Sequence, residues 1–168
     1  MSDGLTAFNT LPDDLARAEL LAVCSSPAWT GEMLAGRPYR SVDALLEHAD
    51  RAVTNLSEAE LDTALAGHPK IGERAGSDHD DRGWSRQEQS TVDRAEPEVL
   101  RALAAGNAAY QRRFGHVYLV NATGKTAERM LEILNQRLDN DPAAERAVVR
   151  GELAKINRIR LAKLLEAI

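Results

Sequence analysis

Histidine is the side chain best suited to exchange protons near neutral pH, and the 168-residue sequence contains His48, His68, His79 and His116. His68 stands in the string Gly67-His68-Pro69, whose glycine and proline end the helix predicted before it. A histidine at such a bend is held in place by the backbone, as a general acid or base must be. This spacing is also compatible with a purely structural role.

Glu88 is a second candidate for acid–base chemistry. The string from Trp84 to Gln89 predicts a helix start in which Ser85 is the N-cap and Glu88 completes a capping box. Glu88 therefore has a structural explanation as well as a catalytic one. The same holds for Arg160, which lies on the last predicted helix and can extend to the solvent like any surface arginine.

Two other histidines and one lysine motif have simpler explanations than function. His48 lies on the polar side of its predicted helix, and His116 fits a hydrogen-bonded structural role as well as a functional one. Gly124-Lys125-Thr126 imitates the end of a phosphate-binding loop, but Leu119 stands where that motif requires glycine. We therefore expect Lys125 to be a solvated residue that precedes a helix.

The elements that must position these residues are helices. Aromatic residues make up only 4% of the chain while leucine and alanine are abundant, a composition that favours packed helices over sheets. Helical spacing is predicted from Leu11-Pro12-Asp13-Asp14 onward, and Ser57 with Glu60 forms a capping box. Residues 70–83 have no periodicity and are predicted to be a loop, whose glycines would allow it to act as a lid.

One segment departs from the helical pattern. Residues 114–120 form a continuous apolar run with β-branched members, which predicts an extended buried segment, and the chain offers it no partner strands. The predicted fold is all-α: a compact bundle of about seven to eight helices with one short extended segment, in a single domain over residues 1–168.

Composition excludes several classes of protein. The net charge of −5 and the lack of a basic stripe argue against nucleic acid as a partner. No apolar run approaches the ~18 residues of a membrane span, and the first residues lack the pattern of a secretory signal. The single cysteine, Cys24, rules out an intramolecular disulfide and fits a reducing compartment, so we expect a cytoplasmic protein.

Several strings together resemble one family, the 2-oxo-4-hydroxy-4-carboxy-5-ureidoimidazoline (OHCU) decarboxylases of purine catabolism. They are His68-Pro69-Lys70-Ile71-Gly72, Trp84-Ser85-Arg86-Gln87-Glu88-Gln89, Phe114-Gly115-His116-Val117-Tyr118-Leu119-Val120, Arg137-Leu138-Asp139-Asn140 and Lys155-Ile156-Asn157-Arg158-Ile159-Arg160-Leu161. Any one string alone is weak, but their order and intervals form a specific combination. The resemblance extends from the Phe8-Asn9 region to the C-terminus.

This resemblance implies an enzyme that converts the small molecule OHCU into (S)-allantoin and CO2, without a metal or other cofactor, and usually as a homodimer. It implies that His68 and Glu88 are catalytic, with their division of proton transfer left open. Arg160 is chosen over Arg158 because it directly precedes Leu161. The substrate-binding residues that it implies are Pro69, Ser85, Gln89, Phe114, Gly115, Val117, Tyr118, Leu119, Val120 and Arg160.

Two other functions remain open at the level of the residues. A metal-dependent hydrolase could combine His68 with Asp78-His79-Asp80-Asp81, although adjacent residues in a polar loop seldom converge on one ion and a solvated loop is the simpler explanation. A helical interaction module without catalytic activity is the second alternative.

Overall fold

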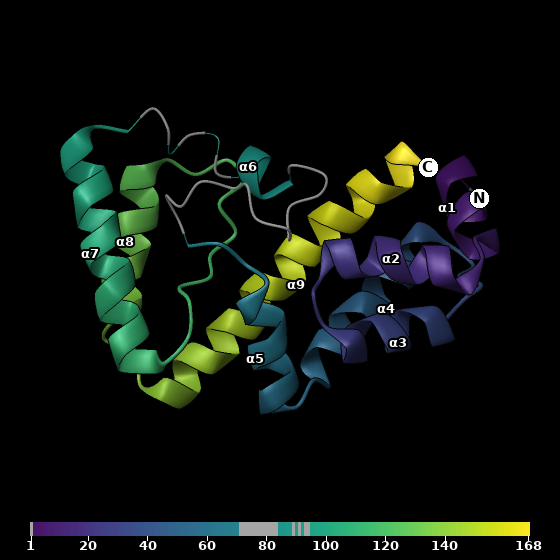
Figure 1. The fold of residues 1–168 in the computed structure, drawn as a ribbon, viewed down its shortest axis with the longest axis horizontal. Coiled ribbons are helices and arrows are strands. Elements are labelled where there is room, and N and C mark those ends of the chain that lie inside the picture. Colours follow the sequence, from purple (N-terminus) through teal and green to yellow (C-terminus); the bar gives the residue numbers. More distant parts are fainter. Residues whose placement is uncertain (1, 71–83, 89, 91, 93–94) are drawn as a thin grey trace. The chain divides into compact units, whose positions relative to one another are not determined.

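The structure, a computed structural model, describes residues 2–70, 84–88, 90, 92 and 95–168, without the side chains of Ser85 and Arg86. The helices in this part of the chain are α1 (Asp3–Thr10), α2 (Asp13–Val23), α3 (Pro27–Ala35), α4 (Val42–Thr54), α5 (Glu58–Ala66), α6 (Trp84–Glu88), α7 (Pro97–Phe114), α8 (Ala127–Arg137) and α9 (Pro142–Ala167) (Figure 1). The described residues include no β-strand, so the predicted all-α fold class is confirmed.

Contacts divide the chain into two compact units. Unit 1 comprises residues 1–64 and 153–168, and unit 2 comprises residues 65–152. Each unit has its own buried side chains and is described by itself.

Unit 1 is built on α1 to α4, with the first part of α5 and the last part of α9. Serine caps begin two of its helices: Ser26 Oγ accepts from the Trp29 N–H at 3.1 Å, and Ser41 Oγ accepts from the Ala44 N–H at 3.0 Å. Helix α3 packs against both α2 and α4. The largest fully buried side chains of this unit are Trp29, Phe8, Leu5, Leu20, Met33, Leu45 and Leu61.

Helix α1 was not predicted and precedes the first expected helix. Ser2 Oγ caps it by accepting from the Leu5 N–H at 3.1 Å, and Leu5 and Phe8 are fully buried. A Cβ on Gly4 would lie 1.8 Å from the Leu165 carbonyl oxygen, so glycine permits a close approach to the C-terminal end of α9 (Figure 1). Because glycine is a poor helix former, the sequence pattern of this short helix is weak.

Unit 2 contains α7 and α8, which pack side by side (Figure 1). Helix α7 ends at Phe114, and Gly115 follows with φ 81°, in the left-handed region that favours glycine. Phe114, which we expected in the extended segment, is therefore helical. The buried core of this unit comprises Val92, Leu103, Tyr110, Tyr118, Val120, Ala122, Ala127, Met130 and Leu134.

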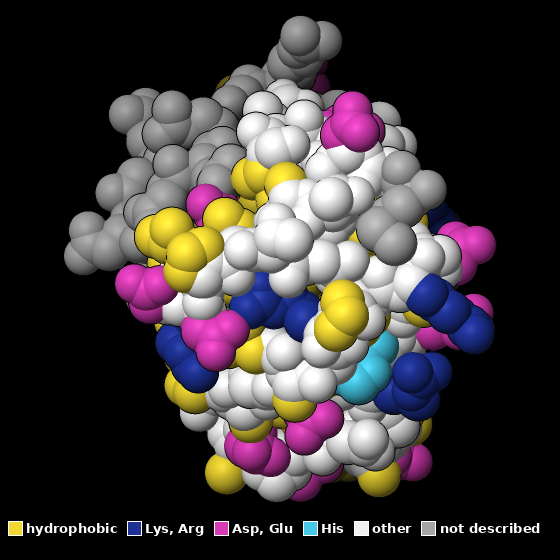
Figure 2. Space-filling model, turned by 90° about the vertical axis from the view of Figure 1, so that its right-hand side faces the viewer, with side chains coloured by type: hydrophobic (Ala, Val, Ile, Leu, Met, Phe, Trp, Pro, Cys, Tyr) yellow, Lys and Arg dark blue, Asp and Glu magenta, His cyan; other side chains and the backbone are white. Residues whose placement is uncertain are grey.

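The surface gives two further findings. No helix among the described residues has both the length and the apolar character that a membrane span requires. On the face of the molecule in Figure 2, acidic and basic side chains are interspersed with hydrophobic ones. That face therefore lacks the continuous positive surface that nucleic-acid binding requires.

Candidate functional site

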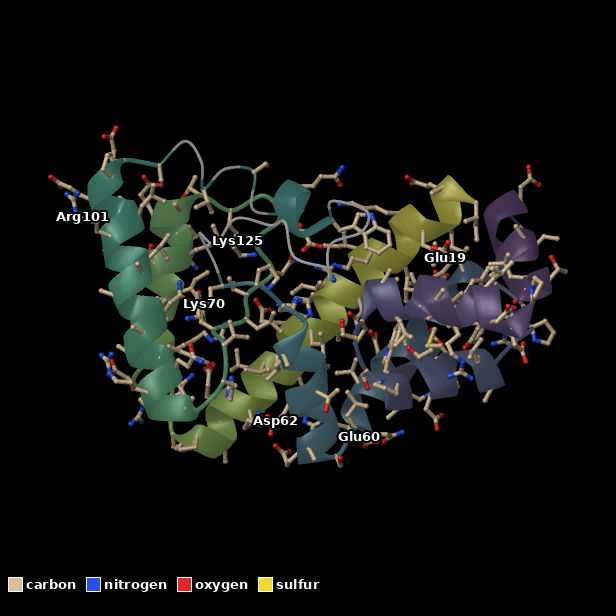
Figure 3. All side chains as sticks on the ribbon, viewed as in Figure 1. Glu19, Glu60, Asp62, Lys70, Arg101 and Lys125 are labelled. Atoms are coloured by element: carbon tan, nitrogen blue, oxygen red, sulfur yellow. The ribbon has the colours of Figure 1, made fainter. Side chains whose placement is uncertain are left out.

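His68 lies just beyond the C-terminal end of α5, as predicted. Its backbone N–H donates to the Leu65 carbonyl at 3.0 Å, and His68 and Pro69 are both half-buried. The capping box is confirmed at the start of this helix, where Glu60 lies (Figure 3): the Ser57 N–H donates to Glu60 Oε1 at 2.8 Å, and the Glu60 N–H donates to Ser57 Oγ at 3.1 Å. The backbone thus fixes a histidine that retains partial exposure, as proton exchange with a bound molecule requires.

Glu88 is the last residue of α6, and only 9% of its surface is exposed. The helix begins at the buried Trp84, two residues earlier than an N-cap at Ser85 predicts, so Ser85 is its second residue and the N-cap prediction is wrong. The first residue of this helix is therefore a buried tryptophan, and the helix does not begin after a serine N-cap. The side chain of Ser85 and the whole of Gln89 lie outside the described residues.

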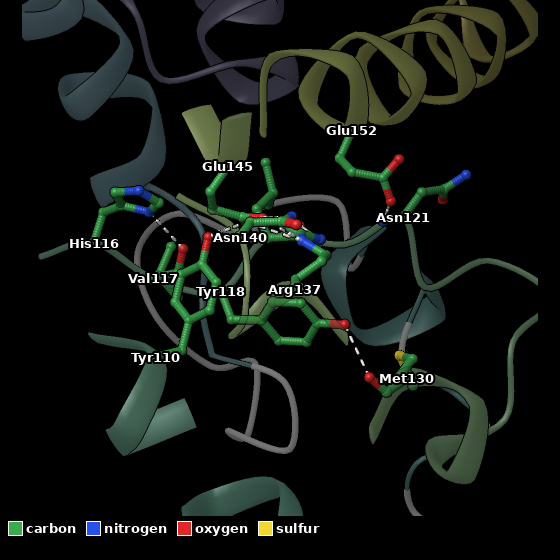
Figure 4. Close-up of polar contacts among 11 residues, drawn as sticks. Tyr110, His116, Val117, Tyr118, Asn121, Met130, Arg137, Asn140, Glu145 and Glu152 are labelled. Atoms are coloured by element: carbon green, nitrogen blue, oxygen red, sulfur yellow. Dashed lines mark hydrogen bonds and ion pairs between the residues drawn. The ribbon is translucent and has the colours of Figure 1, made fainter. Parts of the chain in front are cut away.

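The segment from Val117 to Ala122 has no regular secondary structure, yet Tyr118, Leu119 and Val120 are at most 4% exposed. This agrees with the buried, non-helical segment that the sequence predicts. Side chains from α8 and α9 bind its backbone: Arg137 Nη1 donates to the Leu119 carbonyl at 2.7 Å, and the Asn121 N–H donates to Glu152 Oε1 at 3.1 Å (Figure 4). The Tyr118 hydroxyl donates to the Met130 carbonyl at 2.9 Å.

Val120 differs from its neighbours, because neither its N–H nor its carbonyl has a hydrogen-bond partner within the described part of the chain. Buried backbone groups are paired in the great majority of cases, so such a residue is unusual. Since unpaired donors and acceptors favour a polar ligand, Val120 is a candidate contact for a bound molecule.

Beneath this segment lies a network that sequence reasoning did not predict (Figure 4). Arg137 Nε donates to both carboxylate oxygens of Glu145 at 3.0 and 2.9 Å, and its Nη2 donates to Oε2 at 2.6 Å. Tyr110 donates its hydroxyl to Glu145 Oε2 at 2.5 Å, and Asn140 Nδ2 donates to Oε1 at 3.2 Å. The ends of the Arg137–Asn140 motif therefore bind the same carboxylate, and the motif's visible role is to hold Glu145.

Charge and burial together explain the titration behaviour of this network. Burial raises the pKa of Tyr110 well above its ordinary value, and the Glu145 carboxylate beside the hydroxyl raises it further. Burial lowers the pKa of Arg137, but hydrogen bonds and the charge of Glu145 outweigh this effect and leave the pKa raised. Tyr110 therefore stays a neutral hydroxyl donor and Arg137 a cation at neutral pH.

The two arginines considered as substrate anchors both belong to unit 1. Arg158 donates through Nε and Nη2 to the carboxylate of Asp50, at 2.7 to 3.1 Å. Arg160 is only 5% exposed and donates from Nη1 to the Val23 carbonyl at 3.0 Å. Arg158 is thus engaged in a surface ion pair, whereas Arg160 is a buried cation.

The remaining candidates contact backbone carbonyls or lie outside the described residues. His48 Nε2 lies 3.0 Å from the Glu32 carbonyl oxygen, and His116 Nδ1 lies 3.1 Å from the Val117 carbonyl oxygen. Lys125 (Figure 3) is half-buried instead of solvated, because its Nζ donates to the Asn121 carbonyl at 2.8 Å. His79, the 78–81 string and residues 71–83 of the predicted loop over 70–83 are not described.

A model of the OHCU decarboxylase family matches residues 9–162. The chain belongs to this family. It is 28% identical over 154 residues to the "Uric acid degradation bifunctional protein TTL" of Arabidopsis thaliana, a match that covers 90% of this chain but 48% of that protein. The chain therefore spans about half the length of this relative. It is 26% identical over 145 residues to the 2-oxo-4-hydroxy-4-carboxy-5-ureidoimidazoline decarboxylase of Amia calva, covering 83% and 81% of the two chains.

Solved structures agree with the assignment to the OHCU decarboxylase family. A crystal structure of OHCU decarboxylase in the presence of (S)-allantoin has a TM-score of 0.76 and 26% identity, covering 88% of this chain and 97% of that one. A crystal structure of (S)-allantoin synthase has a TM-score of 0.70, covers 95% and 53% of the two chains, and at 16% identity shows a shared fold alone.

For a member of the OHCU decarboxylase family, the predicted site residues divide between the units. Unit 2 holds His68, Pro69, Ser85, Glu88 and the 114–120 segment, and unit 1 holds Arg160. Within unit 2, Tyr118, Leu119 and Val120 are buried, Val117 is half-buried and Gly115 is exposed. Sequence reasoning missed the support of this segment by Glu145 and Glu152, although both recur on the buried face of α9 seven residues apart, a helical spacing that signals a shared face.

Proposed function

We propose that this protein is a cofactor-independent carboxy-lyase that converts OHCU into (S)-allantoin and CO2 in urate catabolism. The observation that carries the proposal is the OHCU decarboxylase family match over residues 9–162, a range that includes every residue given a role below. The 26% identical relative of Amia calva, matched over 81% of its length, carries that activity in its name and supports the assignment.

The chemistry of the substrate explains why a cofactor is not required. The carbon that loses CO2 also bears a hydroxyl group and adjoins a C=N bond. When the C–C bond breaks, its electron pair forms a new C=C bond, and the C=N electrons move to the nitrogen, which takes up a proton. The hydroxyl then loses its proton to become a carbonyl, and the adjacent carbon gains a proton. The substrate thus supplies its own electron sink, the task for which other decarboxylases use a cofactor.

His68 and Glu88 are proposed to move these protons. The hydroxyl must lose one proton, and one face of the carbon must receive another, so a base and an acid are both needed. His68 is half-buried at a fixed helix end and Glu88 is buried, which suits groups that serve a bound molecule. General acid–base groups typically contribute about 10²- to 10⁴-fold to the rate.

Backbone and side chains are proposed to orient the substrate around these two groups. The N–H and carbonyl of Val120, which have no partner among the described residues, support a role for the 114–120 segment in binding the polar edge of the ring. Pro69 would shape the pocket beside His68, and Ser85 and Gln89 would face the substrate. Such contacts would hold the breaking bond perpendicular to the ring, where it overlaps the C=N bond.

Arg160 is proposed to anchor an anionic or carbonyl oxygen of the substrate. Its burial supports the choice, because a cation attracts an anion more strongly away from water.

We also propose that residues 1–168 act as a single domain, that the enzyme is a homodimer, and that it is cytoplasmic. The continuous family match across both units supports the first point. Leu15 and Leu21 are exposed on α2 and offer apolar area for a second copy. The buried free thiol of Cys24 suits a reducing compartment.

The experiment generates the unstable substrate in situ from urate with urate oxidase and hydroxyisourate hydrolase, and follows optical activity by circular dichroism. We expect rapid formation of (S)-allantoin in the presence and absence of EDTA. Activity that is lost with EDTA and restored by a divalent metal would favour the metal-dependent alternative. Formation of racemic allantoin at the spontaneous rate would refute the proposal.

A further inference from the structure

Val120 is flanked by two peptide groups that carry opposite polarisation. Its N–H belongs to the same peptide group as the Leu119 carbonyl, which accepts from the Arg137 guanidinium at 2.7 Å. Its carbonyl belongs to the same peptide group as the Asn121 N–H, which donates to the Glu152 carboxylate at 3.1 Å. A cation thus binds the peptide group before Val120, and an anion binds the peptide group after it.

Each of these charged contacts changes the group at the other end of its peptide. A hydrogen bond from a cation to a carbonyl draws electron density from the peptide and makes its N–H a stronger donor. A hydrogen bond from an N–H to a carboxylate has the opposite effect and makes the carbonyl of the same peptide a stronger acceptor. Both effects converge on Val120, whose N–H and carbonyl have no partner among the described residues.

The cation in this arrangement is itself fixed. Three hydrogen bonds join Arg137 to Glu145, and both side chains are at most 7% exposed. Tyr110 and Asn140 donate to the same carboxylate, so Glu145 cannot turn away from Arg137 without losing several bonds. The guanidinium therefore holds the Leu119 carbonyl in one position, and with it the direction of the Val120 N–H.

We propose that Arg137 and Glu152 are positioning residues that make Val120 a strengthened donor–acceptor pair for the N–H and C=O edge of a cyclic ureide. The OHCU substrate carries such edges in its 2-oxo ring and its ureido group. The proposal rests on the proposed function, because it takes the 114–120 segment as substrate-binding. Neither side chain touches the substrate; each acts through one peptide group.

The test uses Glu152→Gln, which keeps the shape of the side chain and removes its charge. The double variant Arg137→Met with Glu145→Gln removes both buried charges together, so that neither is left alone in the core. Glu132→Gln is the matched control, because Glu132 is an exposed carboxylate that pairs with Arg129 on α8. Circular dichroism and thermal unfolding establish that each variant is folded.

Two measurements test whether Arg137 and Glu152 position Val120 for the substrate or only stabilise the fold. The first is the decarboxylation assay, in which we expect KM to rise by about tenfold in both test variants, with a smaller change in kcat. The second is competitive inhibition of the decarboxylation by hydantoin, 1-methylhydantoin and 3-methylhydantoin. Hydantoin carries both ring N–H groups, and each methyl derivative lacks one of them. Hydantoin should inhibit wild-type protein and Glu132→Gln more strongly than at least one methyl derivative does. In the test variants, most of this difference in inhibition should disappear.

Folded test variants with wild-type KM and unchanged discrimination would overturn the inference while leaving the proposed function intact. A loss of kcat alone, with inhibition by all three hydantoins unchanged, would also overturn it. Wild-type protein without decarboxylase activity would overturn the proposed function and this inference together.

Discussion

Arg137 and Glu145 form a buried ion pair that joins the end of α8 to the first turns of α9. The Arg137 guanidinium reaches Glu145 Oε2 at 2.6 Å and the Leu119 carbonyl at 2.7 Å, so one side chain binds both a carboxylate and the 117–122 segment. Glu145 is fully buried and receives further bonds from Tyr110 and Asn140. The conformation of a buried segment without secondary structure therefore depends on two charges.

Removing one of these charges should destabilise the protein strongly. Arg137→Met would leave Glu145 buried without its cation, and we expect the free energy of unfolding to fall by about 3–5 kcal/mol. Urea unfolding measures this loss. Arg129→Met is the control, because its ion pair with Glu132 is exposed and should contribute less than about 1 kcal/mol. Similar losses in the two variants would contradict the assigned role of the buried pair.

Glu88→Gln should separate catalysis from stability. The substitution keeps the volume of a buried side chain at the end of α6 and removes its capacity to exchange a proton. We expect kcat to fall by at least about 10²-fold, as general acid–base catalysis predicts. Thermal unfolding of the same preparation should change little. A folded variant with near-wild-type kcat would remove Glu88 from the mechanism.

Arg160 and Arg158 can be distinguished by their effects on substrate binding. Arg160→Gln should raise KM by about tenfold or more through loss of a buried cation. Arg158→Gln breaks a half-exposed pair with Asp50 and should lower the free energy of unfolding by no more than about 1 kcal/mol, with KM unchanged. Steady-state kinetics on variants shown to be folded test both statements. If KM rose only in the Arg158 variant, the assignment of the anchor would be reversed.

Cys24 should make stability depend on alkaline pH. Burial raises the pKa of its thiol from 9.0 to about 11 in the folded protein. Between these values the unfolded chain loses the thiol proton while the folded chain keeps it, so stability falls as pH rises. The effect of the thiol should reach roughly 1 kcal/mol between pH 8 and pH 10.

Urea unfolding at these two pH values, on wild-type protein and Cys24→Ala, isolates this effect from other alkaline titrations. The decrease in stability should be smaller in the variant. Equal decreases in the two proteins would show that the thiol does not contribute.

Local signals in the sequence predicted most helices, because their determinants lie within a few residues of each other. The Ser57–Glu60 box begins a helix where expected, and its two hydrogen bonds join residues only three positions apart. The start of α6 was misplaced, since burial of Trp84 depends on tertiary packing that a capping pattern does not contain.

The candidate site was predictable as a set of residues but not as an arrangement. The resemblance to the OHCU decarboxylase family identified His68, Glu88 and the 114–120 segment as site residues. From spacing alone, each of them could equally have had a purely structural role. The pairing of Arg137 with Glu145 crosses the break at Asn140-Asp141-Pro142, and the contact between Glu152 and Asn121 spans 31 residues. Such contacts depend on how helices pack, which no local pattern encodes.

The central claim, decarboxylation of OHCU with His68 in the site, is tested most directly by the stereochemistry of the product. Substrate generated in situ from urate is offered to wild-type protein, His68→Asn and His48→Asn, and the circular dichroism of allantoin is followed over time. His48 is the control because its ring binds the Glu32 carbonyl in unit 1. We predict rapid formation of (S)-allantoin by wild-type protein and His48→Asn, and only the spontaneous, racemic rate with a folded His68→Asn. Full enantioselective activity in that variant would contradict the account.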